Sequence, residues 1–287
     1  MAAIKEKFKK DRALRFYNEV LGLDRLHYGL FENSDTRNID GLIQAQLRYE
    51  EFLTAEIDLL FPESSDTLIL DVGCGTGSMS ETLYKKSFKV EGLSPDLYQK
   101  ELFEKRIPVP FHLARYQNFA SEKIYDTILM SESAQYIPLK KLFVKTSELL
   151  KDQGYLMVCD YFVLDDATGK MAKSGHRLSA FLEEAQKNNF QIVKEEDITE
   201  AILPTLDTAK IFTEKYILPT IDIVREKFLE RRPFIFKLLK WFFRKNIAKA
   251  QENIILIDSA EFRKNKKYMF FIFKRKTSFN NNLIGFS

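Results

Sequence analysis

The chain has 287 residues, a net charge of +3, and contents of 45% hydrophobic and 30% charged residues. These values are typical of a globular protein with one large core and an elaboration, or with two small domains. No run of about eighteen apolar residues predicts a membrane-spanning helix, and the charged N-terminus lacks the apolar segment of a secretory signal. We expect the two cysteines, Cys74 and Cys159, to be free thiols in a cytoplasmic protein.

The chain changes its periodicity near residue 60. Residues 1–60 have mostly helical periodicity with a loop around residues 33–38, and we interpret them as an N-terminal helical lid. From Leu68 onward, short apolar runs alternate with helical patterns, which predicts a parallel sheet built from βαβ units. The expected strands are Leu68–Val72, Lys89–Leu93, Phe111–Ala114, Thr127–Ser131, Tyr155–Cys159, Gln191–Glu195 and Tyr268–Lys274. The expected helices between them are Ser78–Lys86, Gln99–Lys105, Leu139–Leu150 and Leu178–Asn188.

These elements divide the chain into a core of residues 61–199 and a last strand within residues 251–277. The connection between them, residues 200–250, is too long for a plain loop and predicts an inserted helical cap. We expect the final segment, residues 278–287, to be a disordered tail.

A glycine-rich turn follows the first expected strand. The strand ends at Asp71, and Gly73, Gly75 and Gly77 come next at alternate positions, with Cys74 between the first two. Glycines at a strand-to-helix turn let the main chain approach a ligand closely, and the helix that follows offers unpaired N–H groups. The turn therefore predicts a ligand site at the carboxyl end of the sheet.

This pattern, hydrophobic-x-acidic-x-Gly-x-Gly-x-Gly, resembles that of the class I S-adenosylmethionine-dependent methyltransferases. The resemblance implies an α/β fold with a seven-stranded Rossmann-like sheet, whose last strand is antiparallel and lies beside the fifth. It also implies that S-adenosylmethionine binds at residues 71–77, with Asp71 near its methionine end. Dinucleotide-binding folds space their glycines differently, and Ser78 stands where their third glycine would be.

The second expected strand resembles a subgroup of this family, the cyclopropane fatty-acid synthases and the sterol and tocopherol C-methyltransferases. Most class I enzymes end this strand with an acidic residue that binds ribose, but here the position holds Ser94. The subgroup uses a glutamine seven residues after the strand glycine instead, and Gln99 has this offset from Gly92. Asp96 is the competing ribose ligand, although it can also cap the following helix.

Further residues acquire roles through the same resemblance. Tyr116 and Gln117 follow the third strand, where the family recognises adenine. In the N-terminal region, residues 26–31 resemble a segment that folds over the cofactor as a lid, so that Tyr28 would hydrogen-bond the methionine carboxylate. Plain aromatic packing is the alternative for Tyr28.

The loop after the fourth expected strand, Ser131–Ile137, would face the methyl group. Ser131 is then a cofactor contact, and Glu132 is the best-placed base or cation stabiliser, unless it only anchors the lid. Tyr136, Tyr161 and His176 are secondary candidates at the pocket mouth, with a plain loop position as the alternative for His176. Neither the Asn/Asp-Pro-Pro-Tyr/Phe loop nor the Pro-Cys nucleophile of base methyltransferases is present, and no metal cluster follows the fifth strand.

We therefore expect methyl transfer to a small, apolar or amphipathic molecule rather than to nucleic acid, by a monomer or homodimer. The alternative is a non-catalytic S-adenosylmethionine-binding protein or partner subunit. Residues 234–247 form an amphipathic pattern with Lys237, Lys240 and Arg244 on one side. This helix would either roof the active site or make weak peripheral contact with a membrane.

Overall fold

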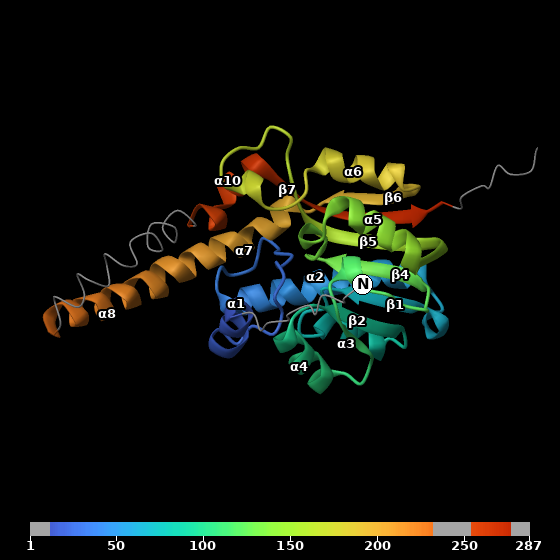
Figure 1. Cartoon of the computed structure of the whole chain (residues 1–287). Helices are drawn as coiled ribbons and strands as arrows, with labels where there is room; N and C mark the ends of the chain where they lie inside the picture. Colours follow the sequence, from blue (N-terminus) through green and yellow to red (C-terminus); the bar gives the residue numbers. More distant parts are fainter. Residues whose placement is uncertain (1–11, 232–253, 277–287) are drawn as a thin grey trace, which may run out of the picture.

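A computed structural model describes residues 12–231 and 254–276. Its centre is a seven-stranded sheet of order β3-β2-β1-β4-β5-β7-β6, with helices on both faces (Figure 1). The strands are β1 Leu68–Val72, β2 Lys89–Ser94, β3 Phe111–Leu113, β4 Tyr125–Ser131, β5 Leu150–Val163, β6 Phe190–Asp197 and β7 Lys266–Arg275. β7 pairs antiparallel with both β5 and β6. The predicted fold class and the place of the last strand are therefore confirmed.

The helices lie close to their predicted positions. The α-helices are α1 Arg12–Arg15, α2 Ile39–Leu60, α3 Ser78–Lys85, α4 Leu97–Arg106, α5 Leu139–Leu149, α6 Leu178–Lys187, α7 Thr199–Phe212, α8 Leu218–Arg231 and α10 Ser259–Asn265. Two π-helical segments are η1 Phe16–Val20 and η6 Thr213–Ile217. Short 3-10 segments are η2 Ser64–Asp66, η3 Tyr116–Asn118, η4 Ala134–Tyr136, η5 Met171–Lys173 and η7 Ile254–Ile257. The largest difference from prediction is β5, which reaches Val163 because it pairs with β7 as far as Lys266.

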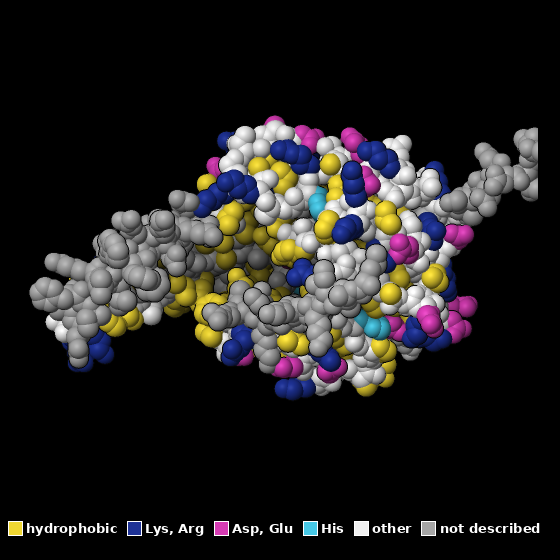
Figure 2. All heavy atoms as spheres, viewed as in Figure 1, with side chains coloured by type: hydrophobic (Ala, Val, Ile, Leu, Met, Phe, Trp, Pro, Cys, Tyr) yellow, Lys and Arg dark blue, Asp and Glu magenta, His cyan; other side chains and the backbone are white. Residues whose placement is uncertain are grey.

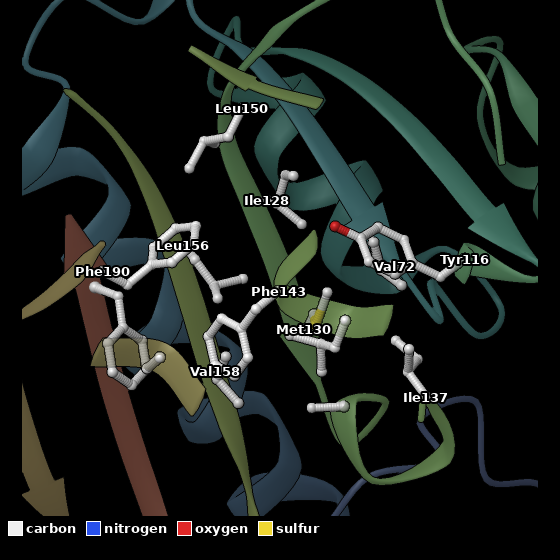
Figure 3. Close-up of a cluster of buried hydrophobic side chains, with 14 of the residues drawn as sticks. Val72, Tyr116, Ile128, Met130, Ile137, Phe143, Leu150, Leu156, Val158 and Phe190 are labelled. Atoms are coloured by element: carbon white, nitrogen blue, oxygen red, sulfur yellow. The ribbon is translucent and has the colours of Figure 1, made fainter. Parts of the chain in front are cut away.

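Alternating strand residues supply two hydrophobic layers, one on each face of the sheet. On one face, Leu70 and Phe181 of α6 belong to a cluster. Met130 and Phe143 of α5 belong to the same cluster (Figure 3). On the other face, Ile69 of β1 packs in a second cluster with residues of α2, α3, α7 and α10. Strands buried on both faces explain why their sequences are continuous apolar runs.

Helix α2 belongs to this second layer. Tyr49, Leu53 and Ile57 are fully buried against the sheet. The boundary predicted at residue 60 therefore falls between helix α2 and the sheet that this helix covers. The segment before α2 crosses over it, since Leu30 N–H donates to the Ala45 carbonyl oxygen at 2.8 Å.

The predicted cap begins inside the core layer and then leaves it. Ile202 and Leu206 of α7 are buried in the second cluster, whereas α8 projects from the body of the molecule and has no buried residue (Figure 1). Hydrophobic side chains reach the surface along this projecting part, among them Ile223 and Phe228 (Figure 2). The amphipathic segment 234–247 and the tail 278–287 lie outside the described residues, and so do their predicted roles. Among the helices of residues 12–231 and 254–276, none has the length and apolar composition needed to cross a membrane.

Candidate active site

A cavity of about 700 Å³ opens at the carboxyl ends of β1, β2 and β4. Residues 71–76 line it after β1, residues 94–96 after β2 and residues 131–133 after β4. The order of connections reverses between β1 and β4, so this is the topological switch point where open α/β sheets bind ligands. The sheet therefore brings the main predicted site segments together.

The three turn glycines have three different surroundings. All adopt positive φ angles, 77° at Gly73, 57° at Gly75 and 87° at Gly77. A Cβ on Gly73 would lie 2.5 Å from Cβ of Ser133, and one on Gly77 would lie 2.7 Å from Cδ2 of Phe103. A Cβ on Gly75 would meet no atom within 4 Å. Gly75 thus leaves space for a ligand, while Gly77 lets α4 approach. Gly77 does not line the cavity, and its predicted cofactor contact stays a prediction.

Asp71 and Cys74 are both buried in this turn. Asp71 accepts a hydrogen bond from Ser80 Oγ at 2.6 Å. Burial raises the pKa of Asp71 to about 6, and the bond from Ser80 offsets only part of this effect. The Cys74 side chain packs with Phe103 and Ile107, and burial raises the pKa of its thiol well above the usual value. The thiol therefore stays neutral, and we expect Cys74 to offer its main chain to a ligand.

Asp96 and Gln99 follow β2 and have different roles: Asp96 caps a helix, and Gln99 has an unpaired side-chain atom. Asp96 caps α4 by accepting hydrogen bonds from the N–H groups of Tyr98 and Gln99, each at 2.8 Å. Ser94 Oγ in turn accepts from the Asp96 N–H at 3.2 Å. Gln99 lines the cavity, and its Oε1 is buried without a hydrogen-bond partner among the described residues. A buried unpaired acceptor is costly unless a ligand supplies the missing donor.

The two residues predicted to recognise adenine both line the cavity. Gln117 is partly exposed. Tyr116 is buried in the core, and its hydroxyl lies 2.8 Å from Thr146 Oγ1. The Tyr116 hydroxyl is used within the protein, because the ring fills the layer between the sheet and α5. A contact of adenine with the main chain of Tyr116 stays a prediction.

Glu132 lies at the floor of the cavity with a φ of 53°, an uncommon value for a residue with a side chain. Its Oε1 accepts two hydrogen bonds of 2.6 Å, from the Tyr28 N–H and the Tyr268 hydroxyl. Burial raises the pKa of Glu132, while the positive field of His27 and these two bonds act against the rise. The neighbouring Ser131 Oγ lies 3.0 Å from the Tyr49 hydroxyl.

The secondary candidates divide into one that lines the cavity and two that do not. Tyr136 lines it and has 77% of its surface exposed. His176 is corrected to a structural residue, because its Nε2 contacts the Ala134 carbonyl oxygen at 2.9 Å and its ring stacks on Phe181. Tyr161 packs edge-on against Phe262, outside the cavity lining.

In the lid segment, His27 lines the cavity and Tyr28 does not. The Tyr28 ring packs between Phe262 and Tyr268, with ring centroids 6.3 and 5.4 Å away. The predicted contact of the Tyr28 hydroxyl with a cofactor carboxylate is therefore corrected: Tyr28 contributes its N–H to Glu132 and its ring to the core. The His27 ring stacks on Tyr49 at 4.5 Å.

Sequence reasoning missed a buried charged cluster beside the glycine turn. Glu50 is 3% exposed, and it accepts hydrogen bonds from Arg25 Nε at 2.8 Å and from Ser78 Oγ. Burial alone would raise the pKa of Glu50. Hydrogen bonds and nearby positive charges lower this pKa on balance, and His27 makes the largest of these contributions. A signal was present, because Glu50 stands in the buried stripe of α2 between Gln46 and Leu53.

The charges around the cavity restrict what it can hold. Four acidic residues line it: Glu50, Asp71, Asp96 and Glu132. Arg115 is the only Lys or Arg among the described lining residues. Such a lining suits a ligand with positive charge and hydroxyl groups, and opposes a pyrophosphate. S-Adenosylmethionine, with its sulfonium, ammonium and ribose, fits these residues. In the described part of the chain, no three His, Cys, Asp or Glu side chains are grouped so that they could hold a metal ion.

The model of a family described as methyltransferase domain matches residues 44–201. The chain belongs to this family. A Dictyostelium discoideum protein assigned as a methyltransferase is 28% identical to this methyltransferase-domain chain over 134 residues. That match covers 45% of the chain and 49% of the relative, so the chain spans about half the length of this curated relative.

Solved structures share the fold of this methyltransferase-domain chain at low sequence identity. A Galdieria sulphuraria protein assigned as a sarcosine dimethylglycine methyltransferase has a TM-score of 0.69 at 16% identity, with 93% of this chain and 99% of that chain covered. Geranyl diphosphate C-methyltransferase of Streptomyces coelicolor has a TM-score of 0.65 at 17% identity, over 92% and 93% of the two chains. The [4+2]-cyclase SpnF has a TM-score of 0.64 at 14% identity, over 97% and 100%. Because a cyclase shares the fold, the reaction must be argued from the residues of the site.

Proposed function

We propose that the chain is an S-adenosylmethionine-dependent methyltransferase whose acceptor is a small, apolar or amphipathic molecule. The observation that carries this proposal is the acid-lined cavity at the glycine turn, whose lining includes Gln99, a residue with a buried and unpaired Oε1. The family supports the choice of cofactor. Several solved neighbours were also determined with S-adenosylmethionine or S-adenosylhomocysteine.

We assign the ends of the cofactor from the positions of the side chains. Asp71 and the main chain of residues 73–75 would hold the methionine end, because they surround the open space at Gly75. Gln99 would donate to and accept from the ribose hydroxyls, as its amide can do both. Gln117 and the main chain beside Tyr116 would face the adenine.

Bound S-adenosylmethionine supplies an electrophilic methyl group on a sulfonium. The cavity walls hold the acceptor in line with that group, and alignment alone can lower the barrier by about 7–11 kcal/mol. Both hydrogen bonds that Glu132 accepts from described residues reach Oε1, so Oε2 is the oxygen that can accept a proton from the acceptor. A general base of this kind contributes about 10²–10⁴-fold.

Apolar side chains in the cavity lining favour an apolar acceptor. Leu26, Tyr136 and Ile137 line the same cavity as Glu132. One neighbour of the same fold is named for C-methylation of geranyl diphosphate, which has a hydrocarbon chain. The acidic lining of this cavity suits such a hydrocarbon chain without the diphosphate. Nothing in residues 131–137 resembles the proline-containing loop that receives a nucleic-acid base.

A second candidate function is binding of the cofactor without methyl transfer. The [4+2]-cyclase neighbour supports this second candidate, because that protein has the same fold but is named for a different reaction. Both functions predict cofactor binding, but only the first predicts methyl transfer.

The first experiment measures the melting temperature with S-adenosylmethionine, S-adenosylhomocysteine and NAD. We expect both sulfur compounds to stabilise the protein, by about 2.7 kcal/mol at a hundredfold excess over the dissociation constant, and NAD to have no effect. Stabilisation by NAD alone would contradict the proposal. The protein is then incubated with methyl-labelled cofactor and fractionated cell extract. Label in the lipid-soluble fraction supports the proposed acceptor, label in nucleic acid contradicts it, and binding without label transfer favours the second function.

A further inference from the structure

Two buried hydroxyl groups connect Ser131 and Glu132, which line the cavity at the end of β4. The Tyr268 hydroxyl donates to Glu132 Oε1 at 2.6 Å, and the Tyr49 and Tyr268 hydroxyl oxygens are 3.1 Å apart. The Tyr49 hydroxyl is also 3.0 Å from Ser131 Oγ. Tyr49 and Tyr268 have no exposed surface, whereas Ser131 and Glu132 line the cavity. A continuous hydrogen-bonded path therefore runs from Ser131 at the cavity, through Tyr49 and Tyr268 in the core, to Glu132 at the cavity.

The direction of this path follows from the number of protons. Tyr268 has one hydroxyl proton, which it donates to Glu132, so its oxygen must accept from Tyr49. Tyr49 then has no proton left for Ser131, and Ser131 must donate to Tyr49. The Cys159 carbonyl oxygen, 3.4 Å from the Tyr49 hydroxyl, is a longer and weaker alternative acceptor. All three hydroxyls thus donate in one direction, toward the carboxylate.

We propose that Tyr268 and Tyr49 are positioning residues for Glu132, which hold Oε1 on the protein side and leave Oε2 directed at the reacting group. This inference rests on the proposed function. It assigns a role to two tyrosines that are far apart in the sequence but share the second hydrophobic layer: Tyr49 lies on α2, and Tyr268 lies on β7, which follows the inserted cap in the sequence. A donor at Oε1 favours the ionised carboxylate, which is the form that accepts a proton.

Other titratable groups also affect the Glu132 carboxylate, and the test must distinguish their effects from those of the two tyrosines. The titratable side chains with an electrostatic effect on Glu132, or affected by it, are His27, Tyr28, Tyr49, Cys159, Asp160, Tyr161 and Tyr268. Burial, with a further contribution from Glu132, raises the pKa of Asp160 to about 8. The test therefore needs a spectroscopic signal that comes from Glu132 alone.

The test is a pH titration of the whole protein labelled with carbon-13 at the glutamate carboxyl carbons. Glu132→Gln identifies the Glu132 signal by its loss. Tyr268→Phe should raise the midpoint of that signal by about one pH unit, since a hydrogen bond to a charged group is removed while the ring remains. Tyr49→Phe should raise it by less, because Tyr49 acts through Tyr268. These shifts need no cofactor and no acceptor.

Tyr125→Phe is the matched control, because Tyr125 is equally buried and donates to another buried carboxylate, Glu91, at 2.8 Å. It should leave the Glu132 midpoint unchanged. An unchanged midpoint in a folded Tyr268→Phe protein overturns the proposal, and so does an equal shift in Tyr125→Phe. If Tyr268→Phe does not fold, Tyr49→Phe decides by the same criterion.

Cofactor binding separates this inference from the proposed function. In the parent, the preference for the cationic S-adenosylmethionine over neutral-sulfur S-adenosylhomocysteine should rise as Glu132 ionises, and Tyr268→Phe should move this rise to higher pH. A shifted carboxyl midpoint with the same preference at every pH overturns the role in positioning for methyl transfer. Absence of binding of either compound overturns the proposed function itself, whatever the carboxyl titration shows.

Discussion

The main-chain N–H of Tyr28 lies 2.6 Å from Oε1 of Glu132, although 104 positions separate the two residues. This bond ties the segment before α2 to the loop after β4. Next to it, a Cβ on Gly29 would lie 2.6 Å from Cβ of Ala45, so glycine is what allows the segment to lie against α2. The lid segment is therefore fixed at both the helix and the candidate base.

Glu132→Gln should keep the fold and remove turnover. An amide oxygen can still accept from Tyr28 and Tyr268, but a neutral amide cannot take up a proton from the acceptor. We expect a loss of at least about 10²-fold in label transfer, with a melting temperature close to that of the parent. Glu183→Gln, on the exposed side of α6, is the control with normal transfer. Full transfer by Glu132→Gln would leave Glu132 with the role of a lid anchor.

The sheet and most of its helices were predictable because most strands are short apolar runs with turn signals at their ends. The glycine turn supplied the family and, through it, the antiparallel last strand. The two outer segments were predicted less well. Periodicity places α2 and α7 as amphipathic helices, but it does not tell which surface their apolar sides cover, and both cover the sheet.

Gln99→Ala should weaken S-adenosylmethionine binding by about 1–3 kcal/mol, because the ribose hydroxyls would lose a buried polar partner. Asp96→Ala should act mainly on stability, costing about 0.5–2 kcal/mol through loss of the α4 cap. Calorimetric titration and thermal unfolding of both variants separate the two effects. Equal cofactor affinity in Gln99→Ala and the parent would refute the subgroup alignment on which the ribose assignment depends.

The lining of the cavity was predictable where a local motif carries it, as for Asp71, Gly75 and Gln99. It was not predictable where distant segments meet. Tyr268 reaches Glu132 only because β7 lies beside β5, and Glu50 reaches the glycine turn only because α2 covers α3 and the sheet. Tyr28 was assigned a hydroxyl contact because sequence shows which side chain is present, but not that its neighbour His27 is the one that faces the cavity.

Alanine at two of the turn glycines should separate folding from binding. In Gly75→Ala the methyl group enters open space, so the cost to stability is about 1–2 kcal/mol for the positive φ, while cofactor binding is lost because the methyl group occupies its place. In Gly73→Ala the methyl group collides with Ser133 as well, so stability falls further. Unfolding in denaturant and cofactor titration measure the two quantities. Normal binding by Gly75→Ala would show that no ligand occupies that space.

The affinity for S-adenosylmethionine should depend on pH through Asp71. Its pKa is about 6 in the folded protein and 3.8 in its ordinary state, so the folded protein binds this proton more tightly than the unfolded chain does. The contribution of Asp71 to stability therefore falls as pH rises from 3.8 to about 6, when the buried carboxylate becomes ionised. A cationic ligand next to Asp71 favours the ionised form. Below pH 6 binding must release the proton, and affinity should fall by up to about tenfold per pH unit. Calorimetry in two buffers of different ionisation enthalpy measures this release, and Asp71→Asn should remove the part that comes from Asp71 while leaving any part that comes from Glu132. Proton release of the same size in Asp71→Asn would assign the effect to another carboxyl group of the cavity.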